Sequence, residues 1–235
     1  MQSAWVLQHT PNETLGTIEA VLGDHQIDAK YIQTYVGQPV PCAMADPAGL
    51  IVLGGPMGVY EETTCPFLRD EMRLIENALT LGRPVLGVCL GSQLLAATLG
   101  AEVKKGKRKE LGWYPVKLSE AATQDSVFGL VRPEFWPFHW HGDVFSLPKD
   151  AVGLASSEQT PYQAFRYGQN AYGILFHLEV TVEQISHMLS DFADELREAG
   201  GDPEAITAQN ARHLPVLREI SDGIFNRWAD KISRS

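Results

Sequence analysis

Two short apolar runs that stop at glycine constrain the fold of this chain more than any other feature. Residues 50–53 read LIVL and stop at a Gly-Gly-Pro turn, and residues 84–89 read PVLGVC and are followed by Leu-Gly. Such runs are typical of strands that a sheet buries on both faces. Residues 66–81, which lie between them, repeat apolar side chains with a helical period. The order strand, helix, strand predicts two parallel strands joined by a right-handed crossover.

The same alternation extends along most of the chain and predicts an α/β fold. Further strands are expected at residues 4–8, 29–36 and 171–176, and a helix is expected at residues 92–99, closed by Gly100. The middle of the chain predicts shorter extended pieces at residues 101–104, 113–118, 135–140 and 152–156.

Capping residues indicate where other helices begin. Asn12 can cap a helix with an apolar stripe. Thr181 and Gln184 form a capping box for an amphipathic helix whose apolar residues continue to Leu196. Pro203 restarts a helix after two glycines, and a separate last helical stretch is expected to follow it.

These elements predict one domain over residues 1–235. We expect an open, mainly parallel, doubly wound sheet of the flavodoxin-like type, with helices on both faces. Residues 181–235 would form a C-terminal helical segment packed on this domain.

Composition excludes several classes of function. Of the 235 residues 44% are hydrophobic, which is ordinary for a globular domain and unlike a disordered chain. A net charge of -10 repels phosphate backbones and anionic membranes, so we expect neither nucleic acid nor a membrane as partner. We find no signal-peptide pattern and no apolar run near the ~20 residues of a membrane span. Three cysteines without paired spacing favour a reducing compartment, and we expect a cytoplasmic protein.

The segment around Cys89 joins a buried strand to a helix and places a nucleophile at the corner. A turn of this kind holds its central residue in a strained backbone conformation, and the glycines at 87 and 91 let neighbouring chain approach. The positive end of the following helix would lie at the Cys89 sulfur and leave the Leu90 N–H free to bind an oxyanion. A structural cysteine beside a helix–sheet contact is the alternative interpretation.

His177 and Glu179 follow the last apolar strand with a spacing of two residues. In extended chain they face the same side, so the carboxylate can hold the imidazole in one tautomer while Leu178 points away. The imidazole could then take a proton from a thiol. The carboxyl ends of parallel strands would bring these groups to Cys89 at one edge of the sheet. An edge histidine beside a solvated carboxylate is the alternative.

The turn Gly54-Gly55 ends another buried strand. Glycines there permit backbone N–H groups to point into a cleft and meet developing negative charge. A turn without a further role is the alternative, but a doubly wound sheet would place this one beside Cys89.

Together and in this order, these segments resemble the class I (triad) glutamine amidotransferases, in particular stand-alone proteins similar to the amidotransferase domain of GMP synthase. The likeness covers nearly the whole chain. It also runs through residues 8–16 (QHTPNETLG), 110–113 (ELGW) and 140–143 (WHGD). Each piece alone is common, whereas the combination is highly specific.

The resemblance implies that Cys89 attacks the side-chain amide of glutamine. His177 would act as base and then as acid for the leaving ammonia, and Glu179 would orient it. The N–H groups of Gly55 and Leu90 would form the oxyanion hole, and no cofactor is implied. The resemblance further assigns substrate binding to Gly54, Gln93, Trp140, His141, Gly142 and Asp143.

Two positions depart from the family pattern. Leu178 stands where the family commonly has Pro, and Trp140 stands where GMP synthase domains often have Ser. The Leu178 side chain would point away from the catalytic residues, and replacing Pro by Leu would only make the backbone less rigid. We therefore expect activity to persist. The backbone of Trp140 would make most of the contacts with the substrate, so we expect this difference to affect details of substrate binding more than the mechanism.

Two other patterns favour ordinary structural roles. His139, His141 and Asp143 are spaced like metal ligands on one face of a strand, but no fourth ligand is evident and we expect no metal. The basic run at residues 104–109 is expected to be a solvated loop, although it could also bind an anionic acceptor or a partner.

These features predict an enzyme that hydrolyses the glutamine side-chain amide through a γ-glutamyl thioester. Since one domain consumes the 235 residues, we expect a separate synthetase partner to accept the ammonia, or no transfer at all. The alternative is a stand-alone hydrolase of γ-glutamyl peptides or amines. A cysteine α/β-hydrolase is disfavoured because its acid precedes the histidine in the chain. A catalytically silent binding module is disfavoured because every triad residue type is intact.

Overall fold

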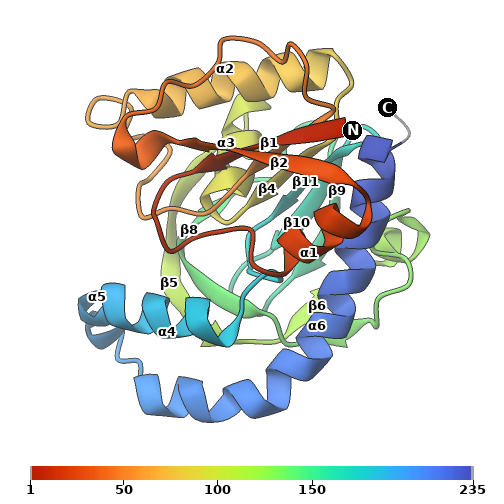
Figure 1. The fold of residues 1–235 in the computed structure, drawn as a ribbon. Helices are drawn as coiled ribbons and strands as arrows, with labels where there is room; N and C mark the ends of the chain where they lie inside the picture. The colour runs from red at the N-terminus through yellow and green to blue at the C-terminus, as the bar shows by residue number, and fades with distance from the viewer. Residues whose placement is uncertain (1, 234–235) are drawn as a thin grey trace.

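A nine-stranded mixed sheet forms the centre of the molecule (Figure 1). The computed structural model describes residues 2–233, so the outermost residues of the predicted domain, Met1 and 234–235, lie outside the described part. Five neighbouring strands run parallel to one another, in agreement with the expected α/β sheet. In spatial order they are β2 (Ile27–Gln33), β1 (Gln2–Gln8), β3 (Gly49–Val52), β4 (Val85–Val88) and β11 (Ala171–Ile174).

Four antiparallel strands extend the sheet beyond β11. The piece expected at residues 152–156 is one of them, whereas the strand at 164–167 was not predicted. The pieces expected at 113–118 and 135–140 each divide between two strands. In spatial order the four strands are β10 (Ala164–Tyr167), β9 (Val152–Ser156), β6 (Val116–Leu118) and β7 (Glu134–Phe135).

A separate antiparallel ribbon consists of β5 (Val103–Trp113) and β8 (Phe138–Phe145). Its register shifts, because Lys105 pairs with Asp143 whereas Glu110 pairs with His141. Residues 106–109 therefore stand opposite Gly142 alone, and β5 bulges at this point. We expected the basic run to be a loop, but it is the bulged part of a strand. We call residues 105–109 the basic bulge.

Helices cover both faces of the sheet, and a hydrophobic cluster lies on each face. The alternation along β3 illustrates this, since Ile51 belongs to one cluster and Leu50 and Val52 to the other. Two short 3₁₀ helices cover Thr34–Val36 and Glu120–Gln124. The α-helices are α1 (Thr17–Asp24), α2 (Phe67–Thr80), α3 (Leu90–Thr98), α4 (Val182–Asp191), α5 (Ala193–Glu198) and α6 (Pro203–Ser233).

The start of α1 differs from the prediction, because Asn12 does not cap it. Gly16 precedes the helix without a side-chain cap, and the Thr17 N–H donates to the Glu179 carbonyl oxygen at 2.8 Å. Asn12 instead donates from Nδ2 to Asp191 at the end of α4. A backbone contact between distant segments therefore sets this helix start.

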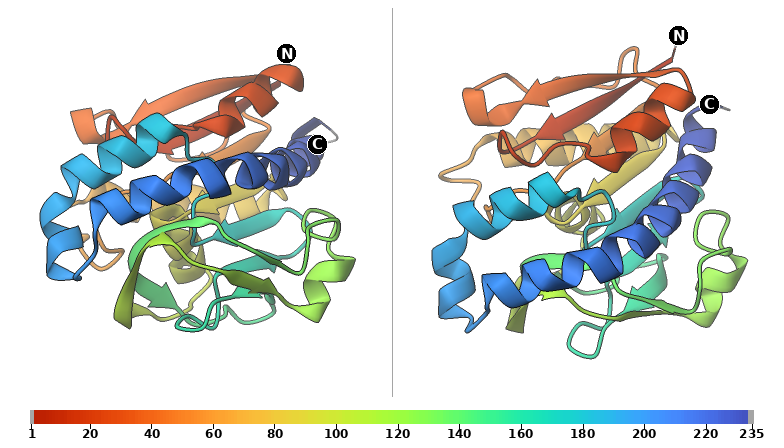
Figure 2. Two further views of the ribbon diagram at one scale, coloured as in Figure 1. Left: turned by 90° about the horizontal axis from the view of Figure 1, so that it is seen from below. Right: turned by 60° about the horizontal axis from the view of Figure 1, so that its bottom comes forward.

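The C-terminal helices also depart from the sequence pattern. The Thr181–Gln184 capping box is present, but the helix expected to continue to Leu196 breaks at Phe192 into α4 and α5. In contrast, α6 continues through Pro215 as one long helix packed beside α1 (Figure 2). None of the described helices is both long and apolar enough to cross a membrane.

Candidate active site

Cys89 lies in a strained turn between β4 and α3, as the strand–helix pattern predicts. Its backbone has φ 49° and ψ -111°, a region that residues with a side chain rarely adopt. The Cys89 N–H donates to the Ile174 carbonyl oxygen at 2.8 Å, and the Ser92 hydroxyl donates to the Cys89 carbonyl at 2.6 Å. A Cβ at Gly87 would lie 2.7 Å from the Ser92 nitrogen, so only glycine fits beside this turn.

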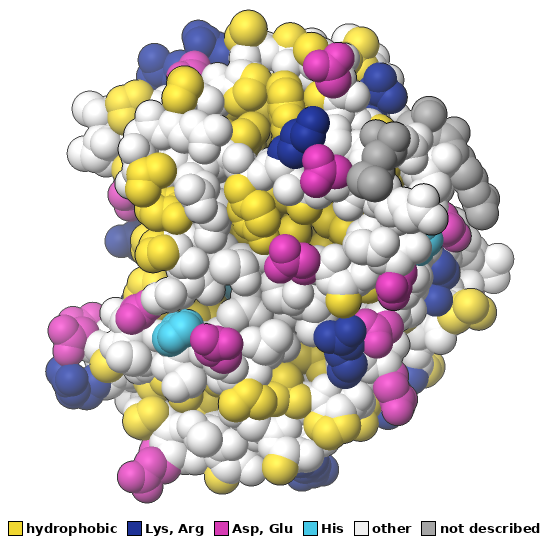
Figure 3. Space-filling model, viewed as in Figure 1, with side chains coloured by type: hydrophobic (Ala, Val, Ile, Leu, Met, Phe, Trp, Pro, Cys, Tyr) yellow, Lys and Arg dark blue, Asp and Glu magenta, His cyan; other side chains and the backbone are white. Residues whose placement is uncertain are grey.

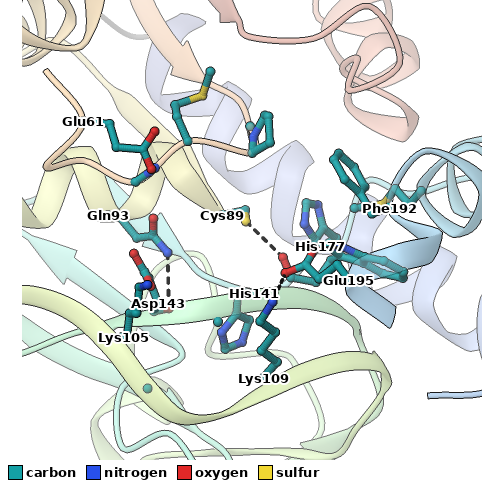
Figure 4. Close-up of a pocket in the computed structure, with 18 of the residues that line it drawn as sticks. Glu61, Cys89, Gln93, Lys105, Lys109, His141, Asp143, His177, Phe192 and Glu195 are labelled. Atoms are coloured by element: carbon teal, nitrogen blue, oxygen red, sulfur yellow. Dashed lines mark hydrogen bonds and ion pairs between the residues drawn. The ribbon is translucent and has the colours of Figure 1, made fainter. Parts of the chain in front are cut away.

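His177 lies beside Cys89, just beyond the end of β11 (Figure 4), and Glu179 follows it by two residues. The His177 N–H donates to the Phe138 carbonyl at 2.7 Å, which fixes this residue to the start of β8. Its Nδ1 is 2.6 Å from Glu179 Oε1. Both side chains are buried, and Leu178 between them packs into the core, away from the site.

The charge environment favours a protonated His177. Burial lowers the pKa of this imidazole, but the Glu179 carboxylate and a hydrogen bond with Cys89 outweigh burial and raise the pKa well above its usual value. An imidazole with a raised pKa can accept the proton of the facing thiol, which supports nucleophilic attack by the sulfur, and can then deliver that proton to a leaving group.

Gly54 and Gly55 form the turn after β3, and this turn packs against the start of α3. A Cβ on Gly55 would lie 2.9 Å from the Leu90 side chain, so the two predicted oxyanion donors are neighbours. A Cβ on Gly54 would overlap the Glu13 carboxylate and lie 3.4 Å from His177 Cε1. Neighbouring atoms leave no room for a Cβ at either position, so both residues of the turn are glycine.

The other predicted residues meet in one cavity of about 510 Å³ above Cys89. Gln93 donates from Nε2 to the Asp143 carbonyl oxygen at 3.2 Å, and Cys89 Sγ lies 3.6 Å from the carbonyl oxygen of Trp140. Figure 3 shows the outline of the molecule indented on the side toward which α5 extends. The predicted residues that line the cavity are Gly55, Cys89, Gln93, Trp140, His141, Gly142, Asp143 and His177, whereas Gly54, Leu90 and Glu179 are outside its lining.

Several cavity residues were not predicted. Glu13 lies against Gly54 near His177, and burial raises the pKa of its carboxyl. Tyr60 is half exposed and lies beside Asp143, and partial burial together with this contact raises its pKa to about 12. The basic bulge also lines the cavity. Glu13 belongs to the segment 8–16, but no spacing in the sequence indicates that it faces His177.

His9 and Glu71 form a buried ion pair behind the Gly54-Gly55 turn. His9 Nδ1 lies 2.8 Å from the Gly54 carbonyl oxygen, and Nε2 lies 2.9 Å from a Glu71 oxygen. Both partners are acceptors, so both ring nitrogens donate and the imidazole is charged. Burial lowers the pKa of His9, but Glu71 reverses this and raises it. The pair holds the Gly54 carbonyl and thereby the turn.

A second buried polar cluster is formed by residues of β5 and β8. Glu110, His139 and His141 bring one donor atom each within 4.8 Å of one another, so these three could hold a metal ion. Thr160 and Gln163 donate to Glu110 at 2.6 and 2.9 Å, so the carboxylate already has protein partners. Asp143 is not part of this cluster, in contrast to the spacing of 139, 141 and 143.

Both histidines of this cluster are neutral. Burial lowers the pKa of His139 well below its usual value and that of His141 to about 3. His139 Nδ1 lies 3.4 Å from His141 Nε2, and His139 Nε2 lies 3.2 Å from the Tyr114 carbonyl oxygen.

Comparison with known proteins places this chain in a family. The chain matches the family described as Glutamine amidotransferase class-I over residues 20–196. The chain belongs to this family. It therefore falls among cysteine-dependent amidohydrolases, whose members hydrolyse the glutamine amide and transfer the ammonia.

Individual proteins similar to this class I amidotransferase support the family assignment. The glutamine amidotransferase-like protein YfeJ of Salmonella typhimurium is 34% identical over 198 residues, which is 82% of each chain. GMP synthase of Leifsonia xyli is 37% identical over 161 residues, 67% of this chain but only 30% of the synthase. A glutamine amidotransferase structure from Thermotoga maritima has a TM-score of 0.88 and 33% identity, covering 97% of this chain and 98% of its own.

Proposed function

We propose that this protein hydrolyses γ-glutamyl amides, glutamine included, with Cys89, His177 and Glu179 as its catalytic triad. The observation that carries the proposal is the juxtaposition of the strained Cys89 turn with a buried imidazole that Glu179 binds at 2.6 Å. Nucleophile, base and orienting carboxylate are the three parts that covalent amide hydrolysis requires.

In the proposed reaction the Cys89 thiol passes its proton to His177 as its sulfur attacks the γ-carbonyl carbon of the substrate. The carbonyl oxygen becomes an oxyanion, which the N–H groups of Gly55 and Leu90 would bind. His177 gives a proton to the leaving nitrogen, the C–N bond breaks, and a γ-glutamyl thioester remains on the sulfur. His177 then takes a proton from water as the water attacks the thioester. It returns that proton to the departing sulfur, which releases glutamate and the free Cys89 thiol.

The substrate α-amino and α-carboxylate groups would bind on the side of Cys89 opposite His177. Gln93 and Asp143 lie together there (Figure 4), and Trp140, His141 and Gly142 lead to them along β8. If the ammonia is transferred, its acceptor would lie outside these 235 residues, on a separate synthetase partner. The match covers only 30% of GMP synthase, which supports a separate protein as the acceptor of the ammonia.

Ammonia release from glutamine by the purified protein tests the proposal. We expect Cys89→Ala to reduce the rate by about 10³-fold or more, because the nucleophile is lost. Cys42→Ala is the matched control, since Cys42 is an exposed free cysteine that does not line the cavity, and it should leave the rate unchanged. The proposal fails if wild type and Cys89→Ala are equally inert toward glutamine and γ-glutamyl peptides.

A further inference from the structure

The cavity continues past the triad, on the side where His177 would release the leaving amine. In Figure 4, Phe192 and Glu195 lie on the same side of Cys89 as His177, whereas Gln93, Asp143 and Lys105 lie on the other side. Because His177 protonates the leaving nitrogen, its side of the cavity must receive the leaving group. The substrate glutamyl part would occupy the opposite side.

Side chains of the C-terminal helical segment form the cavity wall on this leaving-group side. Met188 and Phe192 give it an apolar surface, and the break between α4 and α5 places Phe192 at the cavity. The rings of Phe192 and Trp140 lie 6.2 Å apart. Ammonia has no apolar part, so glutamine alone gives this surface nothing to contact.

The charge of Glu195 in this wall is already compensated. Lys109 donates to its Oε1 at 2.8 Å, and Trp140 Nε1 donates to its Oε2 at 3.1 Å. Glu195 therefore ties the helical segment to the ribbon and leaves little charge for a ligand. Glu13, the other carboxylate near His177, lies against the Gly54 turn.

The basic bulge supplies the positive charge that remains. Lys107 and Arg108 line the cavity, both are exposed, and within residues 2–233 neither makes an ion pair or a side-chain hydrogen bond. They lie along β5 between Lys105, on the glutamyl side, and Lys109, on the leaving-group side. Lys105 also lines the cavity, is exposed and has no such partner within the described residues, but it lies on the glutamyl side, so Lys107 and Arg108 are the two uncompensated cations nearer the leaving group. Such a pair favours an anionic ligand.

We propose that the preferred substrates are γ-glutamyl amino acids or peptides, whose leaving amine carries a carboxylate that Lys107 and Arg108 bind. This inference rests on the proposed function and names its substrate class. Cys89 would form the thioester and His177 would protonate the departing α-amine. The amino acid or peptide leaves with its carboxylate, and water hydrolyses the thioester to glutamate.

The cavity size agrees with this substrate class. About 510 Å³ lies within the range of pockets that bury ligands of drug size, and it leaves room beyond a glutamyl group. Met188 and Phe192 would contact the side chain of the released residue, and the two cations would bind its carboxylate.

Three substrates test the proposal with the full chain at low ionic strength. Glutamine has no leaving-group carboxylate, γ-glutamylglycine has one, and γ-glutamylglycinamide has its uncharged amide. We expect kcat/KM for γ-glutamylglycine to exceed that for the other two by about tenfold. Lys107→Gln with Arg108→Gln should remove this preference and leave glutamine hydrolysis within about twofold of wild type.

Lys104→Gln is the matched control, because Lys104 lies on the same strand, pairs with Glu102 at 2.7 Å and does not line the cavity. It should change none of the three values. The inference is overturned if glutamine and γ-glutamylglycine are hydrolysed equally well. It is also overturned if the double variant lowers all three values alike, since the cations would then bind the glutamyl α-carboxylate. Hydrolysis of none of the three would overturn the proposed function itself.

Discussion

Glu179 Oε1 lies 2.6 Å from His177 Nδ1, so a carboxylate two residues away along the chain holds the imidazole that faces Cys89. Both side chains are buried, and the His177 backbone is bonded to Phe138 on β8. The bond directs His177 Nε2 away from the carboxylate and toward the cavity. It also stabilises the imidazolium, because the pair is shielded from water.

Replacing Glu179 by Gln should shift the pH dependence of the reaction. The Glu179 carboxylate raises the pKa of His177, so its loss lowers that pKa. Activity requires a protonated His177 for the leaving group, and it falls as pH rises through the His177 pKa. We therefore expect the alkaline limb of kcat/KM to move to lower pH, with a loss of about 100-fold at the optimum. The measurement is kcat/KM for glutamine across pH.

Glu183→Gln serves as the control, since Glu183 is an exposed glutamate in the first turn of α4. An unchanged alkaline limb in Glu179→Gln, despite lower activity, would mean that Glu179 acts only by holding the fold.

The parts of the site that the sequence predicts are those set by near neighbours in the chain. The Cys89 turn needs only a strand, a helix and flanking glycines, and the His177–Glu179 contact needs only a spacing of two. The Thr181 capping box is likewise local. Each of these structures can therefore be predicted from a few neighbouring residues, without knowledge of the rest of the chain.

The parts that the sequence does not predict depend on contacts between distant segments. Phe192 breaks a helix that its periodicity would continue, next to Glu195, which is bonded to Trp140. The basic bulge exists because β8 supplies one residue opposite four on β5. Asn12 has the residue type of a cap, but the Glu179 carbonyl binds the start of α1 instead.

The His9–Glu71 pair should contribute measurable stability. Removing one partner leaves the other buried and uncompensated, so Glu71→Ala should lower the free energy of unfolding by about 3 kcal/mol. Urea denaturation checks this value. Glu76→Ala on the same helix is the control, because Glu76 is exposed and should change stability by less than about 0.5 kcal/mol.

The same pair predicts a pH dependence of stability. Glu71 raises the pKa of His9 above the unfolded value of 6.5, against the effect of burial. The contribution of His9 is therefore complete below pH 6.5 and is lost as pH rises through the folded-state pKa. In Glu71→Ala this loss should be smaller than in wild type. Equal pH profiles for the two proteins would contradict a charged His9.

Gly91 should tolerate no side chain. A Cβ there would overlap the Val52 carbonyl group, which belongs to the backbone of β3 and has no rotamer to move. Gly91→Ala should therefore lower the free energy of unfolding by about 3 kcal/mol and also displace the neighbouring Leu90 N–H. A Cβ at Gly23 in α1 meets nothing within 4 Å, so Gly23→Ala should be neutral or stabilising. Similar stability of the two variants in urea would contradict this packing.

Gly54 and Glu13 should be energetically coupled. A Cβ on Gly54 would occupy the position of the Glu13 carboxylate, whereas its next neighbour, His177 Cε1, would lie at an ordinary contact distance of 3.4 Å. Gly54→Ala in the wild-type background must push Glu13 aside, and we expect a cost of about 1–3 kcal/mol. In a Glu13→Ala background the space is vacant, so the same substitution should cost less than about 1 kcal/mol. Urea denaturation of the four proteins gives the coupling energy, and additive effects would show that the two residues do not share this space.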